Sequence, residues 1–243
     1  MAFGTKDDMT RGAEVALPRV TTAAEAGFLR GVYGWMAAGL ALTAVVALFT
    51  VSSPALLQAI FNPESRILFY ALIFGELGLV IWVSAAINRL SPAAATGIFL
   101  LYAGLNGLTL SAILLVYTGA SLAGTFFVTA GMFGSMSLYG AVTKKDLAGW
   151  GSFLFMGLIG IVIASVVNIF MKSDAVSWVM AMCGVVVFTG LAAYDTNKLR
   201  GLARQGFADA GAERKGTIIG ALTLYLDFIN LFLMLLRLFG RRR

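Results

Sequence analysis

Histidine is absent from this 243-residue chain, and cysteine occurs once, as Cys183. Without histidine, a hydrolase of the Ser-His-Asp type has no general base, and a catalytic zinc site loses its usual ligands. A single cysteine can form no disulfide within the chain, so it does not indicate a redox compartment. The absence of histidine also removes the side chain that ordinarily titrates near neutral pH.

Charged residues are scarce, at 12% of the chain against 59% hydrophobic residues, and the mean hydropathy is +0.88. These values lie far outside the range of soluble domains. Crossing a bilayer as a helix takes about 20 apolar residues, and the chain begins with a polar segment in place of a signal peptide. We predict an all-α integral membrane protein with seven transmembrane helices, at Gly31 to Val51, Ile67 to Ile87, Ala93 to Tyr117, Leu122 to Val142, Gly151 to Met171, Ala175 to Tyr194 and Thr217 to Leu238.

The spans leave no large soluble domain. We expect a cytoplasmic arm at residues 1–30, a seven-helix transmembrane domain at 31–240 and a basic tail at 241–243. Glycine pairs such as Gly104 and Gly107 recur along the spans and predict close helix packing.

The net charge is +6, and we interpret the basic residues as topology signals at helix ends, not as a surface that binds nucleic acid. Most of the Lys and Arg residues fall on the side of the N-terminus, which predicts that this terminus and the connector at 195–216 are cytoplasmic and that the C-terminus lies on the opposite side. Arg241 to Arg243 oppose this assignment. A last segment that enters the membrane and returns is the alternative.

Three acids stand inside the predicted spans: Glu76, Asp195 and Asp227. A carboxylate in hydrocarbon is costly, so each must face protein, water or a partner and is a candidate functional residue. Asp195 and Asp227 lie on consecutive antiparallel helices. They meet at one depth only if the helix of Asp195 continues past Leu199 or if water enters the bundle.

Two carboxylates in contact cannot both stay ionised at low cost, so the pair is expected to share a proton. Because unperturbed Asp and Glu titrate near pH 4, such a pair is the only source here of a response near neutral pH. Loss of the shared proton would separate the helices and leave an oxygen-lined site suited to Ca²⁺, with Asn168 and Asn230 as supporting amides. The structural alternatives are a solvated Asp195, a protonated Asp227 bonded to a carbonyl, and Asn side chains that only bridge helices.

Four segments resemble the Bax inhibitor-1 family, also called the transmembrane Bax inhibitor motif family, in its bacterial branch. They are Thr143 to Leu147, Val167 to Phe170, Phe188 to Thr196 and Leu224 to Phe232. The resemblance implies a bacterial inner-membrane protein of seven helices, with the last helix central and surrounded by the other six. It further implies a pH-sensitive calcium leak channel in which the pair Asp195 and Asp227 gates the pore and transiently binds Ca²⁺. Glu76 matches an accessory gating acid of the family. Arg89 is the candidate for the family's gating arginine, although it lies further along the helix than the family pattern places that residue.

The resemblance also leaves an alternative function open. In this alternative the protein is a regulator that binds a partner, such as a membrane-bound protease, without conducting ions. An intramembrane aspartyl protease is a remote alternative, because Tyr194-Asp195 fits its first motif but Leu224 to Asp227 lacks the glycines of the second. We expect no enzymatic activity and no cofactor. The expected partners are the lipid bilayer, Ca²⁺ and protons, without nucleic acid.

Overall fold

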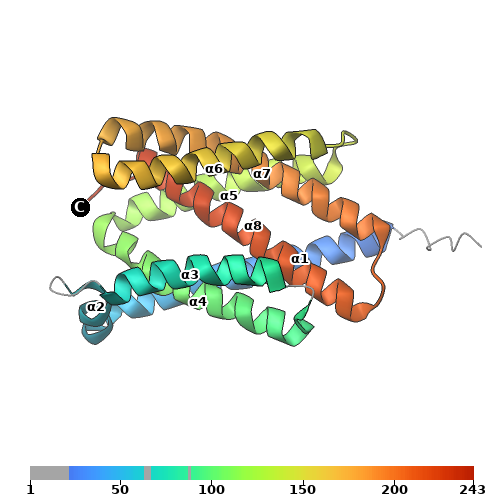
Figure 1. Ribbon diagram of the computed structural model, residues 1–243, viewed down its shortest axis with the longest axis horizontal. Coiled ribbons are helices and arrows are strands. Elements are labelled where there is room, and N and C mark those ends of the chain that lie inside the picture. Colours follow the sequence, from blue (N-terminus) through green and yellow to red (C-terminus); the bar gives the residue numbers. More distant parts are fainter. Residues whose placement is uncertain (1–21, 63–66, 87–88) are drawn as a thin grey trace, which may run out of the picture.

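The computed structural model describes residues 22–62, 67–86 and 89–243, and these residues form eight α-helices (Figure 1). The helices are α1 (Thr22–Ser52), α2 (Pro54–Phe61), α3 (Ile67–Ala86), α4 (Pro92–Val116), α5 (Gly119–Val142), α6 (Ala148–Met171), α7 (Asp174–Gln205) and α8 (Ala210–Phe239). The predicted all-α class is therefore found throughout the described part of the chain.

Short turns separate the long helices, and polar residues in these turns cap the helix that follows. The Ser91 hydroxyl accepts a hydrogen bond from the backbone N–H of Ala94, and Pro92 occupies the first turn of α4, where its missing N–H costs nothing. Thr118, Ser173 and Asp209 cap α5, α7 and α8 in the same way. The brief turns make successive helices run antiparallel, as Figure 1 shows for α5 to α8.

Within the described residues, six helices are long and apolar enough to cross a membrane: α1, α4, α5, α6, α7 and α8. The remaining predicted span, 67–87, corresponds to α3. Its described apolar part, Ile67–Val83, is shorter than the other six, and residue 87 lies outside the described residues. The fold is thus a bundle of membrane-crossing helices, six of which meet the length of a full span.

Helix α8 forms the centre of the bundle and packs against α7, α1, α5 and α4. Its span is the most buried of the six, whereas α6 packs mainly on α7 and directs large apolar side chains such as Phe170 outward. The prediction that the last helix is central is therefore confirmed, but the prediction that all six other helices surround it is wrong. Four helices make the main contacts with α8, while α3 packs on α4 and α6 on α7 at the periphery.

The connector predicted at 195–216 is mostly helical. Helix α7 continues to Gln205, α8 already begins at Ala210, and only residues 206–209 join them. A span predicted from hydropathy ends where polar side chains begin. The helix continues beyond that point, because the backbone keeps its helical hydrogen bonds. In the same way, residues 22–30 of the predicted arm belong to α1, while residues 1–21 lie outside the described part of the chain.

Helix α8 is one continuous helix of 30 residues, so the last segment does not enter and return. The basic tail then reaches the turn between α4 and α5, at the opposite end of the bundle from the α7–α8 connector (Figure 1).

Close packing through glycine occurs at some of the predicted positions and not at others. A Cβ placed at Gly107 would lie 2.7 Å from the Thr43 carbonyl oxygen, so α1 and α4 approach each other there, whereas Gly104 faces open space. Spacing along one helix does not say which face meets a neighbour.

Candidate functional site

Asp195 on α7 and Asp227 on α8 are neighbours across the interface of these helices, and their carboxyl groups interact directly. Asp227 is 6% exposed, and Asp195 is half-buried. Among the described residues, Oδ2 of Asp227 has no hydrogen-bond partner. Two carboxyl groups this close and this poorly hydrated cannot both carry a charge at low cost.

The length of α7 explains how the two carboxyl groups reach the same depth. Asp195 lies ten residues before the end of the helix at Gln205, which is roughly 15 Å at 1.5 Å per residue. The fully buried Thr196 next to it shares a 3.1 Å hydrogen bond with the Tyr33 hydroxyl on α1. Asp195 is therefore held inside the bundle and does not end a helix at its surface.

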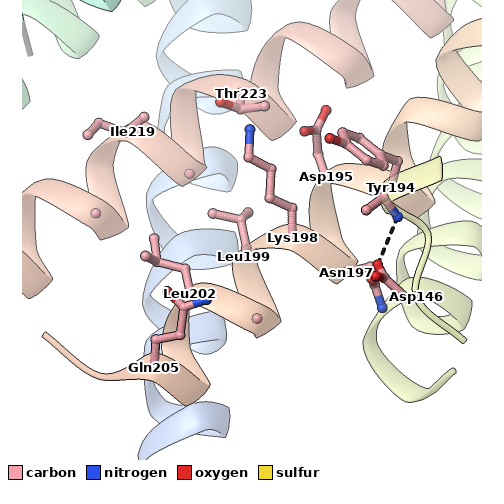
Figure 2. Close-up of a pocket in the computed structure, with 14 residues that line it drawn as sticks. Asp146, Tyr194, Asp195, Asn197, Lys198, Leu199, Leu202, Gln205, Ile219 and Thr223 are labelled. Atoms are coloured by element: carbon pink, nitrogen blue, oxygen red, sulfur yellow. Dashed lines mark hydrogen bonds between the residues drawn. The ribbon is translucent and has the colours of Figure 1, made fainter. Parts of the chain in front are cut away.

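A groove of about 510 Å³ leads from the α7–α8 connector end to Asp195 (Figure 2). Its polar lining includes Asp146, Tyr194, Asn197, Gln205 and Thr223. Asp195 lines this groove, whereas Asp227 is not among its lining residues. A water molecule or cation that enters from this end thus meets Asp195 first and Asp227 behind it.

Lys198 stands in the same groove, one turn after Asp195. Figure 2 shows its side chain extending toward Thr223 on α8, beside the Asp195 carboxyl group. The ammonium interacts electrostatically with Asp195. From the sequence alone, the Lys and Arg residues in general are assigned to topology and Lys198 has no separate role, although a spacing of three residues on a helix places the side chains of Asp195 and Lys198 on one face.

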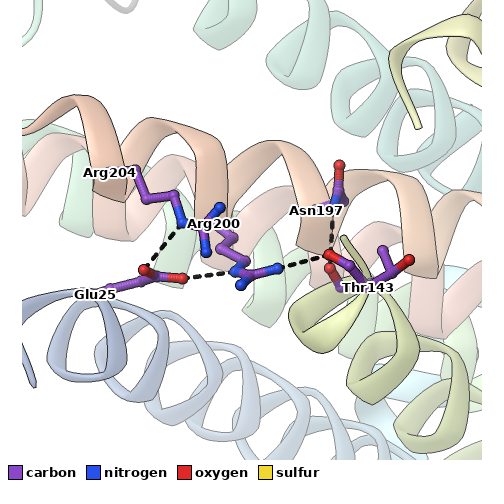
Figure 3. A network of polar contacts seen from close by, with 6 residues as sticks. Glu25, Thr143, Asn197, Arg200 and Arg204 are labelled. Carbon is purple, nitrogen blue, oxygen red and sulfur yellow. Dashed lines mark hydrogen bonds and ion pairs between the residues drawn. The ribbon is translucent and has the colours of Figure 1, made fainter. Parts of the chain in front are cut away.

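The end of α7 is anchored by a charged network that sequence reasoning missed (Figure 3). The Glu25 carboxylate on α1 accepts hydrogen bonds from Arg200 at 2.6 Å and from Arg204 at 3.1 Å. Arg200 also donates at 2.8 Å to the carbonyl of Thr143, in the turn after α5. No sequence motif marks this network, because its members lie in three distant parts of the chain.

Helix α5 approaches α7 closely beside the acid pair. The Asn197 amide donates a 3.1 Å hydrogen bond to the Gly140 carbonyl. A Cβ at Gly140 would lie 3.1 Å from the Ala193 Cα and closer still to its carbonyl oxygen. The residues on either side of Asp195 are therefore packed against two other helices.

Glu76 belongs to a separate cluster between α3 and α4. It is 8% exposed, accepts a hydrogen bond from the Thr109 hydroxyl, and accepts one of 3.3 Å from the Asn106 amide. That amide also donates at 3.4 Å to the Tyr102 hydroxyl, while its own oxygen has no partner in the described residues. No group of three His, Cys, Asp or Glu residues gathers in the part of the chain that the structure describes. The three intramembrane acids thus do not form one site.

Of the remaining candidate residues, Arg89 and Asn168 lie apart from the acid pair, and only Asn230 lies near it. Arg89 is exposed in the turn between α3 and α4, while Glu76 is buried against Thr109 and Asn106. The Asn168 side chain accepts a 3.0 Å hydrogen bond from the Ser173 N–H and closes the α6–α7 turn, at the other end of the bundle from the groove. Asn230 is half-buried on α8, nearly one turn beyond Asp227, and of the two amides it alone is near the pair.

Comparison with known proteins decides the family. The family model described as "Inhibitor of apoptosis-promoting Bax1" matches residues 25–243. The chain belongs to the Bax inhibitor-1 family. It is similar to the inner membrane protein YbhL of Escherichia coli (strain K12), with 55% identity over 217 residues, which are 89% of this chain and 92% of that protein. It is also 39% identical over 248 residues to an uncharacterised protein of Caulobacter vibrioides, covering 98% of this chain and 99% of the relative.

The family membership agrees with the resemblance found in four sequence segments. In the structure of this Bax inhibitor-1 family member, two of those segments, 188–196 and 224–232, lie on α7 and α8 and contain Asp195 and Asp227. Together with its apolar helices, its similarity to YbhL supports an inner membrane location.

Proposed function

We propose that this protein is a pH-sensitive calcium leak channel of the inner membrane, gated by a proton shared between Asp195 and Asp227. The observation that carries the proposal is a carboxyl pair in which the half-buried Asp195 lines a polar groove and the buried Asp227 lies behind it. No other intramembrane acid in the described residues combines a second carboxyl group with a path to water.

The gating step is electrostatic. While one proton remains on the pair, its carboxyl groups can share a hydrogen bond and hold α7 against α8. Loss of that proton places two negative charges in contact, and their repulsion is on the order of 4 kcal/mol for a 4 Å separation at an effective dielectric constant near 20. A bias of this size shifts a two-state equilibrium by roughly a thousandfold, which favours separation of the helices.

The deprotonated pair offers the ligands that Ca²⁺ prefers. Two carboxylates would be joined by water, by the Thr223 hydroxyl in the groove wall and by the amide oxygen of Asn230 after a local shift. The ligands are few compared with a closed calcium site, so binding would be weak. Weak binding suits an ion that must leave as readily as it enters.

Purified full-length protein in liposomes that contain a calcium indicator tests the proposal. Flux should rise with pH in the wild type, and the pH dependence should disappear in Asp195→Asn and Asp227→Asn. Asp174→Asn is the matched control, because Asp174 is an exposed residue in the first turn of the same helix α7. Absence of Ca²⁺ flux at every pH would contradict the channel, and a normal pH profile in both Asn variants would contradict the shared proton.

A further inference from the structure

The three arginines at the C-terminus are held in place by backbone pairing. The Thr118 N–H donates to the Arg241 carbonyl at 3.1 Å, and the Arg243 N–H donates to the Val116 carbonyl at 2.9 Å. The Arg241 N–H donates at 2.9 Å to the Ser121 hydroxyl oxygen on α5. The tail is therefore docked on the α4–α5 turn, which gives its positive charges a defined position.

The docking depends on a glycine at the end of α8. A Cβ at Gly240 would lie 2.5 Å from the ring carbon Cε1 of Tyr117. Only a residue without a side chain lets the tail turn this closely onto the α4–α5 connection.

A groove of about 830 Å³ lies beside the docked tail, between α5 and α8. Its polar end contains Arg241 and the hydroxyl groups of Thr118 and Ser121, and its walls include Val128 on α5 and Leu235 on α8. Val128 lies two turns along α5 from Ser121, roughly 10 Å deeper in the bundle. The groove thus joins a cationic, hydrogen-bonding end to an apolar wall at the end of the membrane-crossing helices.

We propose that this groove binds an anionic phospholipid. Its phosphate lies against the Arg241 guanidinium and accepts hydrogen bonds from the Thr118 and Ser121 hydroxyl groups, which can still donate their own hydrogens. One acyl chain lies between α5 and α8, over Gly124 and against Val128 and Leu235.

Charge complementarity identifies the occupant. Within the described residues, the ion pairs involve Glu25, and none involves the three terminal arginines. The tail stands at the end of the bundle opposite the α7–α8 connector, so its three positive charges lie apart from Lys198, Arg200 and Arg204 near the end of α7. A lipid phosphate at the membrane surface neutralises them at their own depth. This inference rests on the membrane location alone, so it stands or fails separately from the calcium channel.

Native mass spectrometry of the detergent-solubilised full chain tests the proposal, with phosphatidylglycerol, phosphatidylcholine and inorganic phosphate as separate probes. We expect phosphatidylglycerol to bind more tightly than phosphatidylcholine and not to be displaced by equimolar inorganic phosphate. Arg241→Gln should weaken phosphatidylglycerol binding about tenfold. Arg237→Gln is the matched control, because Arg237 is an exposed arginine near the same end of α8 that is not among the groove's lining residues.

A second variant tests the apolar part of the groove. A side chain at Gly124 meets open space, so Gly124→Leu should fill the groove, weaken binding of both lipids and leave the thermal unfolding temperature unchanged. Equal losses in Arg241→Gln and Arg237→Gln would show that only the general positive charge matters and would overturn the site. Unchanged binding in both Arg241→Gln and Gly124→Leu, or displacement by inorganic phosphate, would overturn it as well.

Discussion

The guanidinium of Arg200 lies 2.6 Å from the carboxylate of Glu25 and donates a second hydrogen bond, of 2.8 Å, to the Thr143 carbonyl. One side chain thus joins α1 and the turn after α5 to α7, five residues beyond Asp195. Because Asp195 is carried by the same helix, this anchor restrains any movement of α7 away from α8.

Removal of the anchor should destabilise the protein. The side chains of Arg200 and Glu25 are 15% and 14% exposed, so Arg200→Gln leaves Glu25 with only its exposed partner and should lower the free energy of unfolding by about 1–3 kcal/mol. Arg204 is 55% exposed, and Arg204→Gln should cost no more than about 1 kcal/mol. Thermal unfolding of both variants in one detergent measures the difference. Equal losses would show that the second bond of Arg200, to Thr143, contributes nothing.

The groove predicts unequal access to the two acids. In a Cys183→Ala background, Asp195→Cys should react readily with a charged, water-soluble thiol reagent, because position 195 lines the groove. Asp227→Cys should react at roughly a tenth of that rate or more slowly still, since the bundle must open locally before the reagent arrives. Reaction rates followed by mass spectrometry test this order. A faster reaction at position 227 would contradict the entry path from the connector end.

Lys198 should act as an electrostatic barrier to cations in the groove. Its ammonium lies beside Asp195 on the entry path, so Lys198→Gln should raise Ca²⁺ flux roughly two- to tenfold at low ionic strength, and added salt should reduce the gain. Lys144→Gln is the control, because Lys144 is exposed near the same end of the bundle and is not among the groove's lining residues. If the wild type conducts Ca²⁺ and Lys198→Gln shows the same flux, Lys198 does not lie on the ion path.

The contact of α5 with α7 should tolerate no side chain at position 140. A methyl group at Gly140 meets the backbone of Ala193, so Gly140→Ala should lower the free energy of unfolding by about 1–3 kcal/mol through overpacking. Gly131→Ala, on the same helix but facing open space, should change it by no more than about 0.5 kcal/mol. Thermal unfolding compares the two variants. A stable Gly140→Ala protein would show that the two helices can move apart at no cost.

The Glu76 cluster should matter for stability and not for the response of the acid pair to pH. Thr109→Val removes a hydroxyl that donates to the buried Glu76 and should lower the free energy of unfolding by about 1–3 kcal/mol. Ser135→Ala, which removes an exposed hydroxyl bonded to the Gly131 carbonyl, is the control. The pH dependence of flux should keep its midpoint in Thr109→Val. A displaced midpoint would show that Glu76 is coupled to Asp195 and Asp227.

Much of the helical pattern could be predicted from hydropathy. The predicted spans 93–117, 122–142 and 151–171 fall within a few residues of α4, α5 and α6, because an apolar run that crosses a bilayer must satisfy its backbone internally. The same reasoning ended the sixth span at Tyr194, eleven residues before α7 ends at Gln205. Polar side chains at the mouth of a groove end the apolar run but not the helix.

The sequence by itself determined that this is a membrane protein of helices, that its intramembrane acids are few, and that no histidine is present to sense pH. These properties belong to single residues and to sums along a chain. Only the tertiary structure decided that Asp195 meets Asp227 while Glu76 lies in another cluster, and that Arg200 reaches Glu25. It also showed the terminal arginines docked beside a groove. Such contacts depend on the rotation and tilt of each packed helix, and those are set by all of its neighbours together.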